Sequence, residues 1–223
     1  MEKLETIFKN HRLKKSSKWH HYFDIYDRHL SKFVNKEITL LEIGIAEGGS
    51  LQIWKEYFGF NCNVVGIDIR EECYYDDHSQ IQIHIGDQTD HNFLARVIDK
   101  IGIPDIIIDD GSHVQSHILK TFDFLYPTLN ENGGVYIIED CHTAYWPRFE
   151  GGVNSHLNVV DIFSKRVHDV NSKWYNEPKT PKLKTLDSIH FYDSMIILEK
   201  RKSVYHRYMI DTSSDGPKIM EKV

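Results

Sequence analysis

The chain has 223 residues, of which 40% are hydrophobic and 27% charged, and these values exclude disordered and fibrous proteins. The formal net charge of −6 argues against nucleic acid as the main partner, because binding to a phosphate backbone needs clustered positive charge. No apolar run reaches the ~18 residues of a membrane-spanning helix, so we expect no membrane span. The first residues lack a signal-peptide pattern, and the three cysteines form no CxxC pair, so we expect a cytoplasmic protein.

The expected elements alternate between strands and helices. Residues 1–35 form a helical lead-in with one amphipathic helix over 17–34, and an apolar run at 38–44 predicts the first strand. Further strands are predicted at 63–69, 81–87, 104–113 and 133–142, and helices at 50–59, 91–102 and 116–129. A hairpin is expected over 188–202, turning at Asp193 and Ser194. The fold class predicted is α/β, with a Rossmann-like doubly wound, mostly parallel sheet and a C-terminal antiparallel hairpin, forming one unit over 36–223.

A glycine-rich turn follows the first predicted strand and opens the first long helix. Gly44 allows a sharp turn there, and Gly48 with Gly49 would let the backbone approach a ligand. Asp68 ends the next strand, where a carboxylate can accept hydrogen bonds from both hydroxyls of a ribose. The pattern therefore predicts a site for a nucleoside-containing cofactor, with plain turn chemistry as the alternative.

The turn departs from the dinucleotide fingerprint, because Ala46 replaces its middle glycine. The carboxylates of Glu42 and Glu47 suit a cofactor with a sulfonium and an amino group better than a pyrophosphate. The run Glu42-Ile-Gly44-Ile-Ala46-Glu47-Gly48 resembles motif I of class I S-adenosylmethionine-dependent methyltransferases. The cofactor-binding residues expected from this resemblance are Glu42, Gly44, Glu47, Gly48, Ser50, Asp68, Asp87, Gln88 and Asp109.

Carboxylates also follow the two later strands, in the runs Asp109-Asp110-Gly111-Ser112-His113 and Glu139-Asp140-Cys141-His142. Because these strands are expected to be neighbours, Asp110 and Asp140 would lie close together. Two carboxylates completed by water and substrate oxygens favour Mg²⁺ or Mn²⁺ over zinc. Capping of the following helices is the alternative role for these aspartates.

The sequences IIIDDGSH and YIIEDCHTAYW, together with Ser17-Lys18-Trp19-His20-His21-Tyr22, resemble the metal-dependent sugar O-methyltransferases. Rhamnosyl O-methyltransferases and cephalosporin-hydroxylase-like proteins belong to the same group. The resemblance implies that His113 is the general base and that Asp110 and Asp140 bind the metal, with Glu139 as an additional or supporting ligand. Catechol-type relatives have Asn after the second Asp, where Cys141 stands here, so the third metal ligand stays open.

The resemblance implies an enzyme that transfers a methyl group from S-adenosylmethionine to a hydroxyl of a sugar or glycosylated metabolite. The metal would lower the pKa of that hydroxyl, and His113 and Asp110 would form the catalytic pair. Residues 141–156 would form a lid hinged at Gly151 and Gly152. The substrate contacts expected are His142, Tyr145 and Trp146 from this loop, and His20 and Tyr22 from the lead-in, with Lys18 and His21 as weaker candidates.

Several readings stay open. An NAD-dependent dehydrogenase would need the missing glycine and a Tyr-x-x-x-Lys pair. A hydroxylase-like or N-methyltransferase relative and a non-catalytic cofactor-binding protein are further alternatives, and a homo-oligomer is possible. We expect a polar loop over 171–186. The histidines expected at the surface are His29, His78, His91, His117, His156, His168, His190 and His206.

Overall fold

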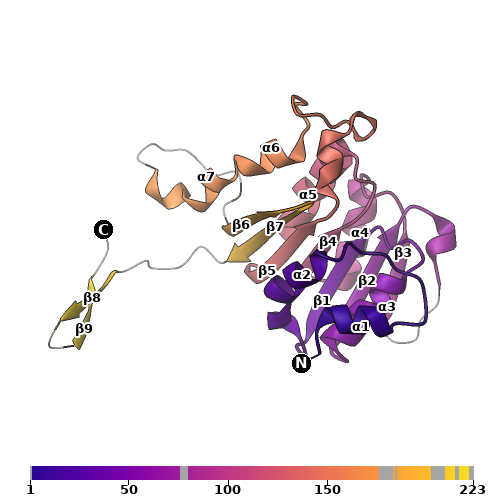
Figure 1. Cartoon of the computed structure of the whole chain (residues 1–223), viewed down its shortest axis with the longest axis horizontal. Helices are drawn as coiled ribbons and strands as arrows, with labels where there is room; N and C mark the ends of the chain where they lie inside the picture. The colour runs from indigo at the N-terminus through magenta and orange to yellow at the C-terminus, as the bar shows by residue number, and fades with distance from the viewer. Residues whose placement is uncertain are drawn as a thin grey trace.

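The computed structural model describes residues 2–75, 80–175, 183, 185–201, 209–213 and 216–220. A seven-stranded sheet in the order β3-β2-β1-β4-β5-β7-β6 forms its centre (Figure 1). The parallel strands are β1 (Ile38–Ile43), β2 (Cys62–Asp68), β3 (Ile81–Ile85), β4 (Ile106–Asp109) and β5 (Asn132–Ile138). β7 (Met195–Arg201) runs antiparallel to both β5 and β6 (Leu186–Tyr192). The predicted mostly parallel sheet and its C-terminal hairpin are both confirmed.

Helices cover both faces of this sheet. The lead-in helices α1 (Leu4–Asn10) and α2 (Tyr22–Leu30) share one face with α3 (Gly49–Phe58). The other face is covered by α4 (His91–Ile101), α5 (Gln115–Leu125) and α6 (Val159–Ser164). The short helices are α7 (Val167–Val170), η1 (Ser31–Phe33), η2 (Glu71–Cys73), η3 (Tyr126–Thr128), η4 (Cys141–Tyr145), η5 (Pro147–Phe149) and η6 (Ser172–Trp174).

Burial on two faces explains why the central strands are continuously apolar. In β4, Ile106 and Ile108 pack in the layer of α1, α2 and α3, whereas Ile107 between them packs in the layer of α4 and α5. All three side chains are fully buried. Successive residues of a strand point to opposite faces, so a strand covered on both sides shows no polar alternation.

The structure differs from the sequence-based elements mainly at the two ends of the chain. The helix expected over 17–34 begins only at Tyr22, because Lys18 and Trp19 hydrogen-bond to carboxylates beyond the sheet edge instead of continuing a helix. The sequence did not indicate α1, nor the separate hairpin of β8 (Met209–Ser213) and β9 (Gly216–Met220), which Figure 1 shows apart from the main sheet. Of the polar loop expected over 171–186, residues 176–182 and 184 lie outside the described residues.

The three cysteines, Cys62, Cys73 and Cys141, are buried and unpaired with one another, in keeping with the absence of a CxxC pair. A helix suited to crossing a lipid bilayer is absent from the described residues. The expected cytoplasmic location stays a prediction.

The turn after β1 packs against the turn after β4 with no space between their backbones. Gly44 has φ +83°, and a Cβ added to it would lie 2.1 Å from the carbonyl oxygen of Asp110. Only glycine permits both that conformation and that approach. The two turns that carry predicted site residues are therefore in direct backbone contact.

We expect Gly44→Ala to lower the free energy of unfolding by about 3 kcal/mol, because it combines a steric clash with a left-handed backbone. Gly133→Ala is the matched control, since Gly133 also has a positive φ (+97°) but an added Cβ there meets no atom within 4 Å. We expect the control to lose about 1 kcal/mol. Urea denaturation of both variants measures the difference, and equal losses would contradict the role of the contact.

Candidate active site

A cavity of about 490 Å³ opens at the carboxyl ends of the parallel strands. Two smaller cavities, of about 370 and 200 Å³, share Ser17 and Asp110 with it. Open α/β sheets bind their ligands in this position. Predicted site residues that line the main cavity are Gly44, Asp68, Asp87, Gln88, Asp110, His113 and Asp140.

Asp68 lies at the end of β2 and faces the turn after β1. Its Oδ2 accepts hydrogen bonds from the backbone N–H groups of Ile45 and Ala46, both 3.1 Å away. Burial acts to raise the pKa of Asp68, but hydrogen bonds from the backbone and side chain of Arg70 outweigh it and lower the pKa overall. The carboxylate is therefore held ionised at the floor of the cavity, next to the glycine turn.

Glu42 lies inside the protein at the end of β1. Its side chain is fully buried and accepts a hydrogen bond of 2.7 Å from the hydroxyl of Ser50 at the start of α3. Burial raises the pKa of Glu42, and the ammonium of Lys18, 3.5 Å away, opposes that effect. Ser50 thus orients Glu42 and also lines the smallest cavity, whereas Glu42 lines none of the three.

The glycines after Gly44 make room for protein groups. A Cβ on Gly48 would lie 2.2 Å from the ring of Tyr75, and one on Gly49 would lie 2.3 Å from the carbonyl oxygen of Lys14. Gly48 is not among the residues that line the three cavities, whereas the exposed Glu47 lines the smallest of them. Contact of Gly48 and Glu47 with a cofactor stays a prediction.

Beyond β4 and β5, three side chains come together as the sequence predicted. Nε2 of His113 lies 3.9 Å from Oδ1 of Asp110 and 3.8 Å from Oδ2 of Asp140. Ligand atoms of all three residues lie within 4.8 Å of one another, a spacing that suits a metal ion. His113 (φ +57°) and Asp140 (φ +53°) both adopt the left-handed conformation, which is uncommon for non-glycine residues although His and Asp adopt it more readily than most.

Lys18 provides a positive charge to this carboxylate cluster. Its Nζ lies 2.6 Å from Oδ2 of Asp110 and 2.8 Å from Oε2 of Glu139, and the side chain is only 6% exposed. Burial alone would lower the pKa of Lys18, but the carboxylates of Asp110 and Glu139 raise it well above its usual range. Burial and the Asp110 carboxylate raise the pKa of Glu139. The carboxylates of Asp110 and Glu139 therefore bind the Lys18 ammonium.

Aromatic residues of the lead-in hold the same carboxylates from the opposite side. Oδ1 of Asp140 accepts hydrogen bonds from the Tyr22 hydroxyl, at 2.9 Å, and from the Trp19 indole N–H, at 3.1 Å. Tyr26, one helical turn after Tyr22, donates its hydroxyl hydrogen to Glu139. The lead-in therefore completes the site, and Tyr22 lies on the metal-ligand side of the cavity.

Gln88 lines the main cavity, and the buried Asp109 lies behind it. The side-chain N–H of Gln88 donates to Oδ1 of Asp109, at 3.2 Å, and to Thr121, at 2.9 Å, while its Oε1 accepts from the backbone N–H of Ser112. Burial raises the pKa of Asp109 to about 7, and Asp109 does not line the main cavity. Asp87 is exposed at the cavity rim, where its carboxylate accepts a hydrogen bond from the N–H of Thr89.

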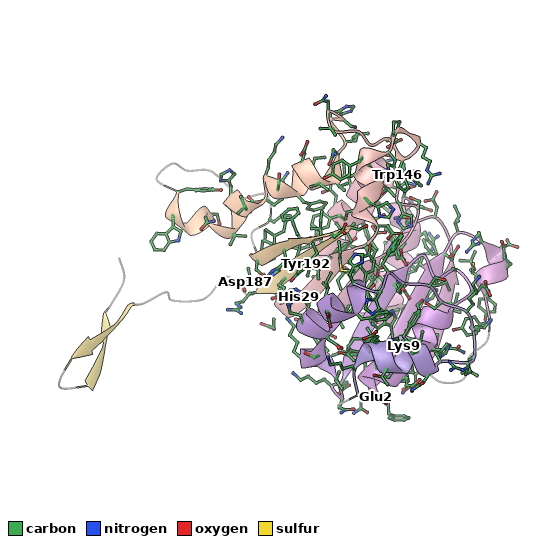
Figure 2. The ribbon with its side chains drawn as sticks, viewed as in Figure 1. Glu2, Lys9, His29, Trp146, Asp187 and Tyr192 are labelled. Atoms are coloured by element: carbon green, nitrogen blue, oxygen red, sulfur yellow. The ribbon has the colours of Figure 1, made fainter. Side chains whose placement is uncertain are left out.

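The predicted substrate residues of the 141–156 loop lie beside the cluster. Nδ1 of His142 lies 2.5 Å from the Ser194 hydroxyl and 4.0 Å from Asp140. Trp146 packs edge-on against the His142 ring and is 41% exposed, and Tyr145 is also exposed. Figure 2 shows Trp146 on the loop above the sheet. None of the three residues lines the three cavities, so their contact with a substrate stays a prediction.

Close backbone contacts hold the ends of this loop, and its role as a lid hinged at Gly151 and Gly152 stays a prediction. A Cβ on Gly151 would lie 2.5 Å from the carbonyl oxygen of Thr143, and Asn158 donates to the carbonyl groups of Ala144 and Gly152. His20 points away from the cluster and pairs with Glu5 at 2.8 Å, with its side chain 81% exposed.

Among the histidines expected at the surface, the expectation for His29 was wrong: it is 5% exposed, because it packs between α2 and the β6–β7 hairpin. His117 and His190 are half-buried, and His117 lines the main cavity with its Nδ1 2.9 Å from the Ser112 hydroxyl. His78 and His206 lie outside the described residues. The sequence also gave Trp19 and Tyr26 no separate role. The spacing of Tyr22, Tyr26 and His29 on one helix face was the available signal.

Comparison with known proteins agrees with the sequence motifs. No family model matches the chain. It is 36% identical over 207 residues to 8-demethyl-8-alpha-L-rhamnosyl tetracenomycin-C 2'-O-methyltransferase of Streptomyces olivaceus, covering 86% of this chain and 53% of that protein. It is 40% identical over 139 residues to mycinamicin VI 2''-O-methyltransferase of Micromonospora griseorubida, covering 59% and 34%. The chain thus spans about half or less of the length of these relatives.

The structure matches that of MycE, the methyltransferase of the mycinamycin biosynthetic pathway, solved with Mg and SAH. The TM-score is 0.82 at 29% identity, over 91% of this chain and 55% of MycE. The chain is a homologue of sugar O-methyltransferases. Its fold is that of a class I methyltransferase, as the glycine turn and the C-terminal hairpin predicted.

Replacing Lys18 tests whether the stability of the protein depends on this buried ammonium. We expect Lys18→Met, measured without divalent metal, to lower the free energy of unfolding by about 3 kcal/mol, because it leaves buried carboxylates unpaired. Lys15→Met is the control, since Lys15 is 73% exposed and lies 4.0 Å from an exposed Glu47; its expected change is below about 0.5 kcal/mol. Chemical denaturation measures both. A Lys18→Met protein as stable as the control would show that the ion pairs contribute no net stability.

Proposed function

We propose that this chain is an S-adenosylmethionine-dependent, divalent-metal-assisted O-methyltransferase that acts on a hydroxyl of a sugar or glycosylated metabolite. The observation that carries the proposal is the convergence of Asp110, His113 and Asp140 at the rim of the cavity that Asp68 and the glycine turn also line. A cofactor site and a metal-and-base site thus adjoin one another. The relatives' names and the SAH and Mg in MycE support this assignment.

The residues present fit a divalent cation of the Mg²⁺ class. Asp110, Asp140 and Glu139 offer carboxylate oxygens, which Mg²⁺ and Mn²⁺ prefer, and Asp110 and Glu139 already hold the Lys18 ammonium. These carboxylates would hold the metal. Glu139 would be the third ligand, since Cys141 is buried and directs its thiol to the carbonyl oxygen of Ile138. When bound, the metal lowers the pKa of a coordinated sugar hydroxyl.

His113 is placed to accept the proton of the acceptor hydroxyl. Its Nε2 faces both metal-ligand carboxylates, and the side chain is 23% exposed, so a substrate can reach it. Histidine is the side chain most often used as a general base in enzymes. The side-chain N–H of Gln115 donates a hydrogen bond to the carbonyl oxygen of His113, at 3.1 Å, and so holds the backbone of this turn.

The cofactor would lie across the ends of β1, β2 and β3. Asp68 can accept hydrogen bonds from ribose hydroxyls, and Asp87 with Gln88 lines the part of the cavity beyond β3. S-adenosylmethionine supplies an electrophilic methyl group on its sulfonium. The carboxylates around the turn favour this positive charge, and the close contact of Gly44 with Asp110 brings the cofactor turn and the metal ligands together.

An acceptor would enter beside the lead-in. The cavity of about 370 Å³ is lined by Trp19, Tyr22 and the three carboxylates, with Lys18 at its wall. The exposed rings of Trp19 and Trp146 flank His142, at 6.1 and 4.7 Å between ring centroids, and present flat apolar surface of the kind that stacks on sugars. These features favour a sugar acceptor without selecting one hydroxyl.

We expect His113→Ala to lower methyl transfer by about 10²–10⁴-fold through loss of the base. The assay follows methyl-labelled S-adenosylmethionine and an α-L-rhamnoside acceptor, with and without Mg²⁺. Binding of S-adenosylhomocysteine, measured by calorimetry, should be unchanged. His91→Ala, in an exposed histidine at the start of α4, is the control. Full turnover by His113→Ala would refute its role, and transfer that persists in a chelator would refute the metal's role.

Asp68→Asn tests the cofactor site independently of the acceptor. We expect affinity for S-adenosylhomocysteine to fall by about 10–100-fold, because hydrogen bonds to a charged carboxylate are lost. Asp87→Asn, at the exposed rim, should have a smaller effect. Calorimetry without any acceptor measures both values. Unchanged affinity in Asp68→Asn would move the cofactor elsewhere in the cavity.

A further inference from the structure

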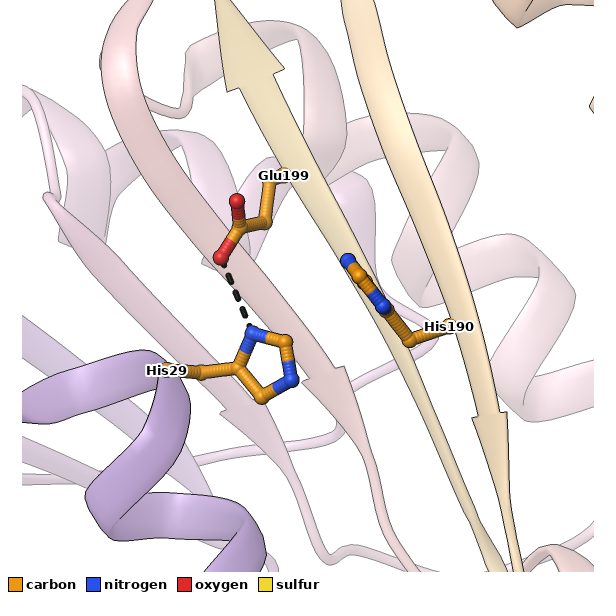
Figure 3. A group of neighbouring side chains, drawn as sticks. All are labelled: His29, His190 and Glu199. Atoms are coloured by element: carbon orange, nitrogen blue, oxygen red, sulfur yellow. Dashed lines mark hydrogen bonds and ion pairs between the residues drawn. The ribbon is translucent and has the colours of Figure 1, made fainter.

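A second group of potential ligands lies away from the proposed active site, where α2 crosses the β6–β7 hairpin. Nδ1 of His29 lies 2.9 Å from Oε1 of Glu199, and the ring centroids of His29 and His190 are 4.6 Å apart. Figure 3 shows His29 reaching from the helix toward Glu199 on one strand, with His190 on the neighbouring strand. Ligand atoms of the three residues all lie within 4.8 Å of one another.

The sheet register explains this convergence. Glu199 of β7 pairs with Ser188 of β6, and His190 pairs with Ile197. Residues two apart on a strand share a face, so His190 and Glu199 are diagonal neighbours on the face that α2 covers. His29 comes down on that face from the last turn of α2 and is buried there. Three different elements thus supply the three side chains.

The chemistry of this group differs from that of the carboxylate cluster. Two imidazoles and one carboxylate form a ligand set typical of zinc and related transition metals, whereas Mg²⁺ prefers oxygen ligands. The Tyr192 hydroxyl lies 2.9 Å from Nε2 of His29, which leaves Nδ1 directed at Glu199. Figure 2 shows His29 and Tyr192 side by side. A hydrogen bond to the second ring nitrogen is the usual support for a histidine that ligates metal.

Two cationic side chains, those of Lys32 and Arg28, lie beside this group. Lys32 lies 3.5 Å from Oε1 of Glu199 and is 42% exposed, so its ammonium can move into solvent when a dication arrives. The Arg28 guanidinium faces the Tyr192 ring, 5.7 Å from its centroid.

We propose that His29, His190 and Glu199 form a binding site for a transition-metal dication of the zinc class, which fastens α2 to the β6–β7 hairpin. Tyr22, Tyr26 and His29 follow one face of α2 at helical spacing, and the first two contact Asp140 and Glu139. The Tyr22 hydroxyl oxygen also lies 3.0 Å from the carbonyl oxygen of Ser194 in the hairpin turn. A metal at the far end of this face would hold the whole face against the sheet.

Metal titration of the untagged full chain tests this site. After treatment with a chelator, the protein is titrated with Zn²⁺ or Co²⁺ in excess Mg²⁺, which competes with the added metal for the carboxylate cluster. His113→Ala, which removes the imidazole of that cluster, is titrated in parallel. We expect one equivalent of Zn²⁺ to bind by calorimetry and Co²⁺ to give the visible absorption bands of nitrogen ligation. Saturating Zn²⁺ should raise the melting temperature by about 5 °C.

His190→Ala should weaken Zn²⁺ binding by about tenfold or more and abolish the thermal shift, since it removes a ligand but leaves the bond between His29 and Glu199 in place. His113→Ala, in the other cluster, should leave the Zn²⁺ affinity unchanged. If His190→Ala does not fold, His190→Gln is used in its place. The Co²⁺ spectrum of the unaltered protein tests for nitrogen ligands without any variant. Three results would each overturn the site: no Zn²⁺ binding under excess Mg²⁺, unchanged affinity in the His190 variant, or loss of binding in His113→Ala.

Discussion

Four carboxylates meet at one edge of the sheet, and their mutual repulsion is the constraint around which the surrounding structure is arranged. Glu42 and Glu139 are buried, and Asp110 and Asp140 lie at the rim of the cavity. In a low-dielectric interior such a group needs a compensating cation or shared protons. Lys18 supplies positive charge, and raised pKa values at Glu42 and Glu139 show the burial cost that remains.

This constraint gives the lead-in segment its conformation. Lys18 and Trp19 stay out of the helix that their sequence favours because each has a carboxylate partner within hydrogen-bonding distance. Tyr22 and Tyr26 continue the contact along α2, and His29 ends it at the hairpin. The lead-in is therefore part of the proposed active site, although it precedes the first strand of the sheet by many residues.

The sequence predicted the sheet well because its strands carry a strong signal. Continuous runs such as Ile106–Ile108 are buried on both faces, and the glycine turn at Gly44 marks a β1–α3 junction that little else would produce. Asp110, His113 and Asp140 were brought together correctly, since the carboxyl ends of neighbouring parallel strands meet at one edge.

What the sequence could not give are contacts between segments far apart in the chain. The pairing of Lys18 with Glu139 spans 121 residues and has no local pattern. The burial of His29 depends on the register of β6 against β7, which places Glu199 and His190 under α2. The same limit applies to Gly48 and Gly49, which were expected to make room for a ligand. Their neighbours are Tyr75 and the backbone of the lead-in, which are distant in sequence.

The contact between Gly44 and the Asp110 carbonyl has a consequence for how such a protein can change. It joins the turn after β1 to the turn after β4 at the backbone, where no side chain can be trimmed or enlarged to adjust their separation. If the proposed function holds, a change of acceptor preference would therefore leave this backbone contact unaltered. The variation would fall on the lead-in around Trp19 and on the loop around Trp146, whose exposed rings can be exchanged without moving either turn.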